Sequence, residues 1–277
     1  MEEIRLAYQR LRAMENVECL VGEHCCELTY LQGIIDHLQS RADLEGYEVL
    51  ITDHLTGIRE PAENMLVFFL SNEDHRLPDF AEEVALTFTP YPPLYNHSKV
   101  KPIPLGPNGK VPHDTPLPVN QRKPKLFFSG RKINRRASFL QGLEKLEEKR
   151  PGFTNTTISR RFEGGIDPAT YAKMLNEYLF VPAPEGNFSD ISFRFFEAAR
   201  QGGIVLAPSL PDFWFFRPFP GVIIEDWHQL PEKINTLLEN PDGLQTMQNA
   251  ILAYYRDYCS ETAVAEFILG EIEKPRR

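Results

Sequence analysis

The feature that most restricts the fold is a proline-rich stretch over residues 90–124, which holds ten of the chain's 23 prolines. Because proline fixes φ and lacks a backbone N–H, this stretch predicts neither a helix nor the interior of a sheet. We expect a semi-rigid linker over residues 101–124, with one short strand near Lys101–Leu105. The linker separates an N-terminal lobe, residues 1–100, from a C-terminal lobe, residues 125–250, and each lobe is long enough to bury its own core.

The composition is that of a folded globular protein. Apolar residues make up 42% and charged residues 25%, which excludes extensive disorder. The net charge of −9 argues against a general nucleic-acid-binding surface. No apolar run approaches the ~18 residues that span a bilayer, and the acidic start of the chain lacks the apolar part of a signal peptide. The four cysteines have neither zinc-site nor disulfide spacing, which is typical of a reduced cytoplasmic protein.

The N-terminal lobe shows alternating helical and strand patterns. Apolar residues at helical spacing predict a helix over Leu28–Gln39. Short runs rich in β-formers predict strands at Tyr47–Thr52, Met65–Leu70 and Val84–Thr89. The second of these runs is apolar throughout, as in strands that are covered on both faces. We therefore expect a parallel α/β layer.

The C-terminal lobe repeats this rhythm more clearly. Asp167-Pro168 predicts a capped helix start, and Gly202-Gly203 predicts a helix end. Strands are predicted at Lys125–Ser129, Thr156–Ser159, Leu179–Ala183, Ile204–Ala207 and Val222–Ile224, and helices at Arg135–Lys149, Asp167–Tyr178, Ile191–Gln201 and Pro231–Glu239. Residues 251–277 predict a C-terminal helix that packs back on the N-terminal lobe. The predicted fold is α/β, with two Rossmann-like lobes.

One strand–loop–helix junction in the C-terminal lobe predicts an anion site. The strand Leu179–Ala183 leads into a loop with Gly186 and Ser192, and a helix follows with Arg194 in its first turn. Helix N-terminal N–H groups and a guanidinium favour phosphate. Glu197 lies three residues further on, where its carboxylate could accept hydrogen bonds from ribose hydroxyls. The alternative interpretation of this spacing is an Arg194–Glu197 ion pair on the helix surface.

Two motifs resemble the donor-binding region of exostosin-like glycosyltransferases and related GT-B enzymes. One is P-x-G…S-x-R-x-x-E-A…G-G-I-V over residues 184–205, and the other is F-F-S-G-R over residues 127–131 followed by Arg135 and Arg136. The I-P-L-G run at 103–106 is similar to the segment before the inter-lobe hinge of these enzymes. The resemblance implies two Rossmann-like lobes facing a cleft, with the nucleotide-sugar donor on the C-terminal lobe.

The resemblance also implies roles for individual residues. Ser192 and Arg194 would contact the donor diphosphate, and Glu197 the ribose. Arg131, Arg135 or Arg136 would join Arg194 in stabilising the departing diphosphate. The implied reaction moves a sugar to a hydroxyl acceptor on a glycan, a glycolipid or another molecule. A bacterial or viral cytoplasmic enzyme fits a chain without an evident anchor.

The sequence also bears on metal use and stereochemistry. It contains no Asp-x-Asp pair, so we expect no metal ion and no cofactor beyond the nucleotide-sugar substrate. The two glutamates eight residues apart that are typical of retaining GT-B enzymes are missing, because Phe193 stands eight residues after Glu185. This favours inversion of the transferred sugar.

An inverting transfer needs a base for the acceptor hydroxyl. Catalytic residues of parallel α/β layers collect beyond the carboxyl ends of strands. Asp53 and His54 follow one predicted strand of the N-terminal lobe, and Glu73, Asp74 and His75 follow the next. We expect Glu73 or Asp74 to be the base, with Asp53 as the third candidate.

Two other functions stay open at this stage. The first is glycosylation of hydroxymethylated DNA bases, because Arg122–Arg136 contains seven basic residues that could bind a polyanion. The second is a non-catalytic α/β module that binds a nucleotide or a sugar. The aromatic run Phe213–Phe219 could stack on a base or sugar, or could be buried in the core.

Overall fold

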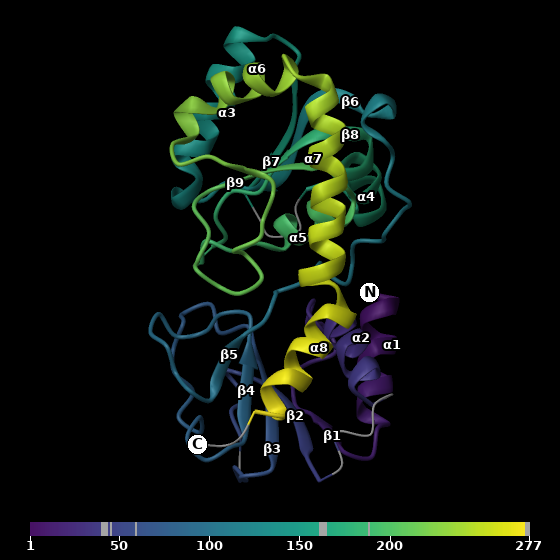
Figure 1. Cartoon of the computed structure of the whole chain (residues 1–277), viewed down its shortest axis with the longest axis vertical. Coiled ribbons are helices and arrows are strands. Elements are labelled where there is room, and N and C mark those ends of the chain that lie inside the picture. The colour runs from purple at the N-terminus through teal and green to yellow at the C-terminus, as the bar shows by residue number, and fades with distance from the viewer. Residues whose placement is uncertain (40–43, 45, 59, 161–164, 188, 275–277) are drawn as a thin grey trace. The chain divides into compact units, whose positions relative to one another are not determined.

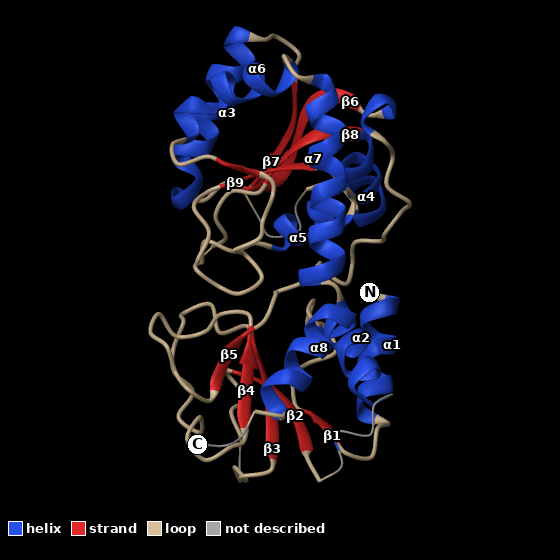
Figure 2. Cartoon of the chain, in the orientation of Figure 1, coloured by secondary structure: helices blue, strands red, loops and turns tan. Residues whose placement is uncertain are grey.

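The computed structural model describes the whole chain except residues 40–43, 45, 59, 161–164, 188 and 275–277. The chain divides into two units, each with a five-stranded parallel sheet (Figures 1 and 2). Unit 1 comprises Met1–Lys110 and Tyr258–Arg277, and unit 2 comprises Val111–Asp257.

Unit 1 is built around a sheet whose strands follow one another in chain order. Its elements are α1 (Glu2–Arg12), β1 (Val17–Cys19), α2 (Leu28–Gln39), β2 (Glu48–Asp53), β3 (Met65–Leu70), β4 (Leu86–Thr89), β5 (Val100–Pro102) and α8 (Glu261–Ile272). All neighbouring strands pair in parallel, and β3 lies at the centre with every residue buried. Helix α2 packs against both α1 and α8. The predicted helix Leu28–Gln39 and strand Met65–Leu70 are confirmed.

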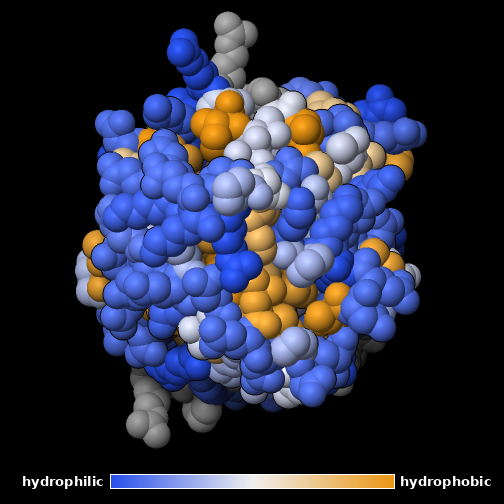
Figure 3. Space-filling model, turned by 90° about the horizontal axis from the view of Figure 1, so that it is seen from above, coloured by the Kyte–Doolittle hydropathy of each residue, from blue (hydrophilic) through white to orange (hydrophobic). Residues whose placement is uncertain are grey.

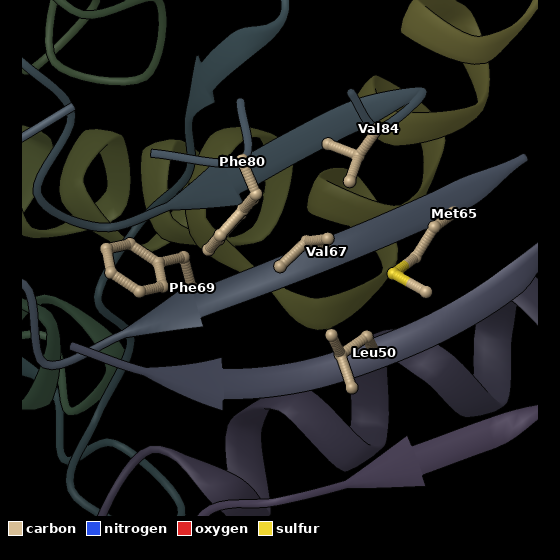
Figure 4. Packing of buried hydrophobic residues seen from close by; sticks show 6 residues of the cluster. All are labelled: Leu50, Met65, Val67, Phe69, Phe80 and Val84. Atoms are coloured by element: carbon tan, nitrogen blue, oxygen red, sulfur yellow. The ribbon is translucent and has the colours of Figure 1, made fainter. Parts of the chain in front are cut away.

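The core of unit 1 departs from a regular helix-covered layer. Among the described residues between β2 and β5, none belongs to an α-helix. One face of β2 and β3 is covered by side chains of the β3–β4 connection, where Phe80 and Val84 pack against Leu50, Met65 and Val67 (Figure 4). The expected alternation of strands and helices therefore fails here, because loop side chains bury the face that crossover helices usually cover.

The C-terminal segment belongs to unit 1. The hydroxyl of Tyr30 on α2 donates to the carbonyl of Cys259 at 2.6 Å, just before α8. Lys101 of β5 forms an ion pair with Glu271 of α8 at 3.0 Å. Strand β5 ends the sheet, so Pro102 lies on an edge strand, where the lack of a backbone N–H is tolerated.

Unit 2 is a doubly wound α/β domain. Its elements are β6 (Lys123–Arg131), α3 (Ala137–Lys149), β7 (Thr154–Ser159), α4 (Pro168–Glu177), β8 (Tyr178–Pro182), α5 (Phe193–Arg200), β9 (Ile204–Ala207), β10 (Val222–Ile223), α6 (Leu230–Leu238) and α7 (Pro241–Tyr254). The sheet order is β10-β9-β8-β6-β7. Asp167 caps α4 as predicted, since its carboxylate accepts from Thr170 N at 2.9 Å. Helix α5 ends at Arg200, and Gly202 follows two residues later with a left-handed φ of 70°.

One expectation about the proline-rich stretch is wrong. Pro124 lies within β6, which is an interior strand of the unit 2 sheet. The pairing of β6 with β8 shifts register between Lys123 and Leu126, so the missing N–H of Pro124 falls at a bulge rather than in a regular ladder.

Hydrogen bonds to side chains of unit 2 hold residues 111–122 in that unit. Leu117 N donates to Asn176 Oδ1 at 2.8 Å, and Val119 N donates to Gln245 Oε1 at 3.0 Å. The Arg122 side chain is buried, and all five of its N–H groups are bonded: they donate to Leu117 O, Leu175 O, Tyr178 O, Asn176 Oδ1 and Gln201 O. This part of the expected linker is thus bound to a folded unit.

The surface carries few large apolar side chains. Leu55 and Leu94 in unit 1 are the most exposed of them among the described residues. Seen from above, most side chains on the surface are hydrophilic, and apolar ones gather in a narrow central band (Figure 3). Within the described ranges, no helix has both the length and the apolar character needed to cross a membrane.

The Arg122 contacts predict a large effect of mutation. Arg122→Leu leaves several buried carbonyl oxygens without a donor, so it should lower the free energy of unfolding of unit 2 by about 3–5 kcal/mol. The neighbouring Lys123 is exposed and pairs with Glu177, so Lys123→Ala should cost less than about 1 kcal/mol. Urea denaturation of both variants measures the difference, and equal costs would contradict this role for Arg122.

Candidate functional site

The sheet of unit 2 has a topological switch point between β6 and β8. These strands are neighbours, yet the chain leaves β6 towards β7 on one side and continues from β8 towards β9 on the other. In open α/β sheets, ligands bind beyond the carboxyl ends of the strands at such a point. Two loops meet there: one follows the end of β6 at Arg131, and the other lies between β8 and α5, with residues 183–187 and 189–192 described.

Arg136 connects these two loops. It lies in a 3₁₀ turn before α3 and is buried. Its Nε donates to Glu185 O at 2.7 Å, and its Nη1 donates to Arg131 O at 3.0 Å. The guanidinium thus holds the end of β6 and the loop after β8 in a fixed relation.

Arg194 reaches the same place from the first turn of α5. Its guanidinium donates to Ser129 O, and its Cζ lies 4.4 Å from the centre of the Phe128 ring. A Cβ at Gly130 would lie 2.8 Å from Arg194 Nη2 and 2.9 Å from the ring of Phe128. Glycine at position 130 therefore lets the arginine approach the strand end, which explains this part of the F-F-S-G-R motif.

The electrostatics of this cluster favour an anion. Burial, and next the Arg194 charge, lower the pKa of Arg136 to about 10. Among the described residues, neither Arg194 Nε nor Glu185 Oε2 has a hydrogen-bond partner, and both atoms are buried. A buried unpaired donor costs about 1–3 kcal/mol, and a ligand oxygen would remove that cost. A bound anion would also reduce the repulsion between the guanidinium groups of Arg136 and Arg194.

The start of α5 adds backbone donors. Ser192 is the N-cap residue, but its side chain makes no cap bond, and its Oγ lies 3.4 Å from Pro184 O. The amide groups of the first turn therefore lack a side-chain cap, which suits an anion. Gly186 shapes the loop before the helix: its N donates to Ser189 O at 2.8 Å, and a side chain there would collide with the Ile191 carbonyl.

Two other predicted donor-site residues have partners in unit 2. Glu197 is only 5% exposed, so the alternative of an ion pair on the helix surface does not hold. Its Oε2 accepts from the Tyr171 hydroxyl at 2.9 Å. Arg135 forms an ion pair with Asp190, and both side chains are about half exposed. Arg131 is exposed at the end of β6. The roles of these residues towards a ligand stay predictions.

The predicted base candidates lie at the carboxyl ends of β2 and β3 in unit 1. Asp53 Oδ1 accepts from Leu55 N at 3.0 Å and from Thr56 N at 2.8 Å, so it stabilises a turn. Asp74 is exposed and pairs with Arg76 at 2.9 Å. Glu73 is half-buried, and its pKa is raised by burial and then by Asp74. Among the three, Glu73 has the environment of a base.

Sequence reasoning missed one carboxyl group at this edge. Glu27 stands directly before α2 and is 6% exposed. It accepts from Ser71 Oγ at 3.0 Å, which places it beside the loop that carries Glu73. An acidic residue at a helix start is common on protein surfaces, so only its burial distinguishes it. In the described part of the chain, no group of three or more His, Cys, Asp or Glu side chains has the arrangement of a metal site.

Comparisons with known proteins agree with this fold. No family model matches the chain, and no curated protein matches its sequence. Among solved structures, a variant of TarM from S. aureus in complex with fondaparinux, α-GlcNAc-glycerol and UDP has a TM-score of 0.57 and 13% identity, over 89% of this chain and 59% of that one. The chain thus spans less than two thirds of TarM.

Two further structures match over more of their length. A glycosyltransferase from Rickettsia africae has a TM-score of 0.52 and 8% identity, over 99% of this chain and 94% of that one. Anabaena HepE in complex with UDP-glucose has a TM-score of 0.51 and 10% identity, over 96% of this chain and 81% of that one. At these identities the likeness establishes the fold, so the predicted GT-B class with two parallel α/β units is confirmed.

The guanidinium cluster predicts binding of a diphosphate by unit 2. Arg194→Ala removes a charged donor and should weaken binding of UDP and of inorganic pyrophosphate by about 1.5–3 kcal/mol. Gly130→Ala should weaken both ligands too, because the new methyl group displaces Arg194. Arg217→Ala, which removes an exposed arginine of the same unit, is the matched control and should leave binding unchanged. Calorimetry measures each affinity, and wild-type affinity in Arg194→Ala would contradict the site.

Proposed function

We propose that this protein is a glycosyltransferase that moves a sugar from a nucleotide-diphosphate donor to a hydroxyl acceptor. The observation that carries the proposal is the position of buried Arg136 and half-buried Arg194 at the switch point of unit 2, where Arg194 Nε has no partner among the described residues. The fold supports it, since GT-B structures such as TarM with UDP and HepE with UDP-glucose share the arrangement of two parallel sheets. The exostosin-like motifs of residues 127–131 and 184–205 support it as well.

The donor would be held by unit 2. Ser192, Arg194 and the N-terminus of α5 would contact the diphosphate, and Arg131 and Arg135 would extend the positive region. Glu197 would contact the ribose, with its Oε2 held in place by the Tyr171 hydroxyl. Gly186 would allow the loop before α5 to approach the donor closely.

The chemistry follows from these groups. In the proposed reaction the acceptor oxygen attacks the anomeric carbon, and the bond from this carbon to the diphosphate breaks. The electron pair of that bond goes to the leaving phosphate oxygen, where Arg194 and Arg136 stabilise the charge. Glu73 accepts the proton of the acceptor hydroxyl. A single displacement of this kind inverts the anomeric centre, and the guanidinium groups take the place of a divalent metal ion.

The structure weakens the case for a DNA acceptor. The seven basic residues of Arg122–Arg136 do not form one exposed surface: Arg122 and Arg136 are buried, and Lys123 and Arg135 pair with acidic side chains. A polyanion needs several accessible cations in register with its phosphates. A non-catalytic binding module would have the same unit 2 site, so turnover decides between it and the enzyme.

Turnover without a metal ion is the direct test of the proposed function. The wild-type protein is incubated with UDP-sugars and other nucleotide sugars, together with glycan and glycolipid acceptors, and products are measured by mass spectrometry. We expect a glycoside product and free nucleoside diphosphate, both unaffected by EDTA. Donor binding without any product would favour the binding module, whereas activity lost in EDTA and restored by Mn²⁺ would refute metal independence.

The proposed role of Glu73 as the base predicts how its substitution changes kcat and KM. Glu73→Gln should lower kcat by about 100-fold or more, with the KM for the donor nearly unchanged, because the base acts mainly in the transition state. In the wild type, kcat/KM should fall as pH decreases through the raised pKa of Glu73, since the protonated carboxyl cannot accept a proton.

The neighbouring residue provides the control. The charge of Asp74 contributes to the raised pKa of Glu73. Asp74→Asn should therefore remain active, and its kcat/KM should begin to fall at a lower pH than that of the wild type. An unchanged kcat in Glu73→Gln would show that another group is the base.

A further inference from the structure

Glu27 is a buried carboxyl group without a counter-ion. Its Oε2 accepts from Ser71 Oγ at 3.0 Å and from Cys25 Sγ at 3.3 Å, and its Oε1 accepts from Ser71 N at 3.4 Å. The described part of the chain gives it no ion pair. An unpaired buried carboxylate is strongly disfavoured, so burial of this residue lowers stability unless its proton is retained. A leucine or methionine at this position would fit the interior better.

The residue that Glu27 holds is itself strained. Ser71 directly follows the central strand β3, and its φ is 53°. His75, four residues later, has a φ of 56°. In the described part of the chain these are the two non-glycine residues with positive φ, and they bracket Glu73. Left-handed backbone of this kind costs on the order of 1 kcal/mol and persists only where other contacts impose it.

Contacts at both ends hold this segment, the Ser71–His75 loop, in place. Asn72 Nδ2 donates to Arg76 O at 2.8 Å and to Tyr91 O at 3.2 Å. His75 Nδ1 lies 2.8 Å from Pro92 O, and its ring meets the Tyr91 ring edge-on at 5.9 Å. Glu27 supplies the remaining anchor, at Ser71. The loop that carries the proposed base is therefore fixed from β3 to the segment after β4.

Burial favours the neutral form of Glu27. It is the main cause that raises the pKa of this carboxyl, and the charge of Glu73 adds to it, whereas the bonds from Cys25 and Ser71 lower the pKa by less than burial raises it. Burial is the largest cause that raises the pKa of the Cys25 thiol and the pKa of Tyr91. Cys25 and Tyr91 therefore stay neutral, and Glu73 is the nearby group that carries negative charge.

We propose that Glu27 is a positioning residue: its protonated side chain holds Ser71 in the left-handed conformation and thereby fixes the loop that presents Glu73. This inference rests on the proposed function, because Glu73 is assigned there as the base. In the proposed protonated form, Glu27 Oε1 still accepts from Ser71 N, and Oε2 donates its proton to Ser71 Oγ in place of the bond that Oγ donates to the ionised group. A glutamine amide has the same shape and the same pair of donor and acceptor, so Gln reproduces the neutral acid.

Matched variants at the two positions test the proposal. Glu27→Leu keeps an apolar side chain of similar volume but removes both bonds to Ser71, and it should lower kcat about 100-fold while UDP affinity stays at the wild-type value. Glu27→Gln should recover most of the lost turnover. Ser71→Gly adopts positive φ without strain and should be more stable than Ser71→Ala, which loses the hydroxyl and keeps the strain.

A pH series gives a measurement that does not depend on activity. The folded state binds the Glu27 proton more tightly than the unfolded state, whose pKa is near 4.5. The stability from this proton is complete below the unfolded value and is lost as pH rises through the raised folded pKa. The Tm of Glu27→Gln relative to wild type should therefore increase steadily from pH 4.5 upwards.

The outcomes separate this inference from the proposed function. If Glu27→Gln is as inactive as Glu27→Leu while its Tm and UDP affinity remain normal, the carboxylate itself is required and the positioning role is overturned. A Tm difference between Glu27→Gln and wild type that does not change with pH overturns the protonated state. If the wild-type protein transfers no sugar, the proposed function fails, whereas the pH series and the Ser71 pair still test the anchor.

Discussion

The bonds of Arg136 to the carbonyls of Glu185 and Arg131 are the interaction on which the candidate donor site depends. A parallel sheet with a switch point leaves two loops diverging beyond β6 and β8, and nothing in the sheet itself fixes their separation. The guanidinium, rigid and with its donors in one plane, fixes it. Arg194 then reaches from α5 to Ser129 O and the Phe128 ring, so two positive groups are held at one place.

The faces of a parallel sheet have to be covered, and the two units cover theirs with different elements. Unit 2 covers its sheet with helices, so its site lies at helix starts and strand ends. In unit 1 the β3–β4 connection covers part of the sheet with Phe80 and Val84 instead. That connection has to turn sharply after the central strand, which places Ser71 and His75 in left-handed backbone. The strain is thus a consequence of the fold, and the contacts of Glu27, Asn72 and Tyr91 stabilise it.

Much of the fold could be predicted because its signals are local. Apolar periodicity marked Leu28–Gln39 and Met65–Leu70, and the Asp167-Pro168 pair marked the start of α4. Pro124 was misjudged because a bulge depends on the register of the partner strand β8, which no local pattern shows. In the candidate site, Arg194 and Glu73 could be placed from their position after strands. Glu27 could not, because its burial and its bond to Ser71, 44 residues further along the chain, depend on tertiary contacts that no local pattern shows.

Charged side chains with buried polar atoms differ in how completely these atoms are hydrogen-bonded, and the difference points to the candidate donor site. Every N–H group of the Arg122 guanidinium donates a hydrogen bond to the protein, so this buried charge is fully hydrogen-bonded. Its role is to hold residues 111–122 in unit 2. Arg194 and Glu185 are half-buried, and each has one buried polar atom without a partner among the described residues. A fold selected for stability alone has no reason to retain such atoms, since apolar side chains would fill the same space at lower cost. Their persistence beside a helix N-terminus is explained if a ligand completes the bonds. The incomplete bonding of Arg194 is therefore a stronger sign of function than its charge.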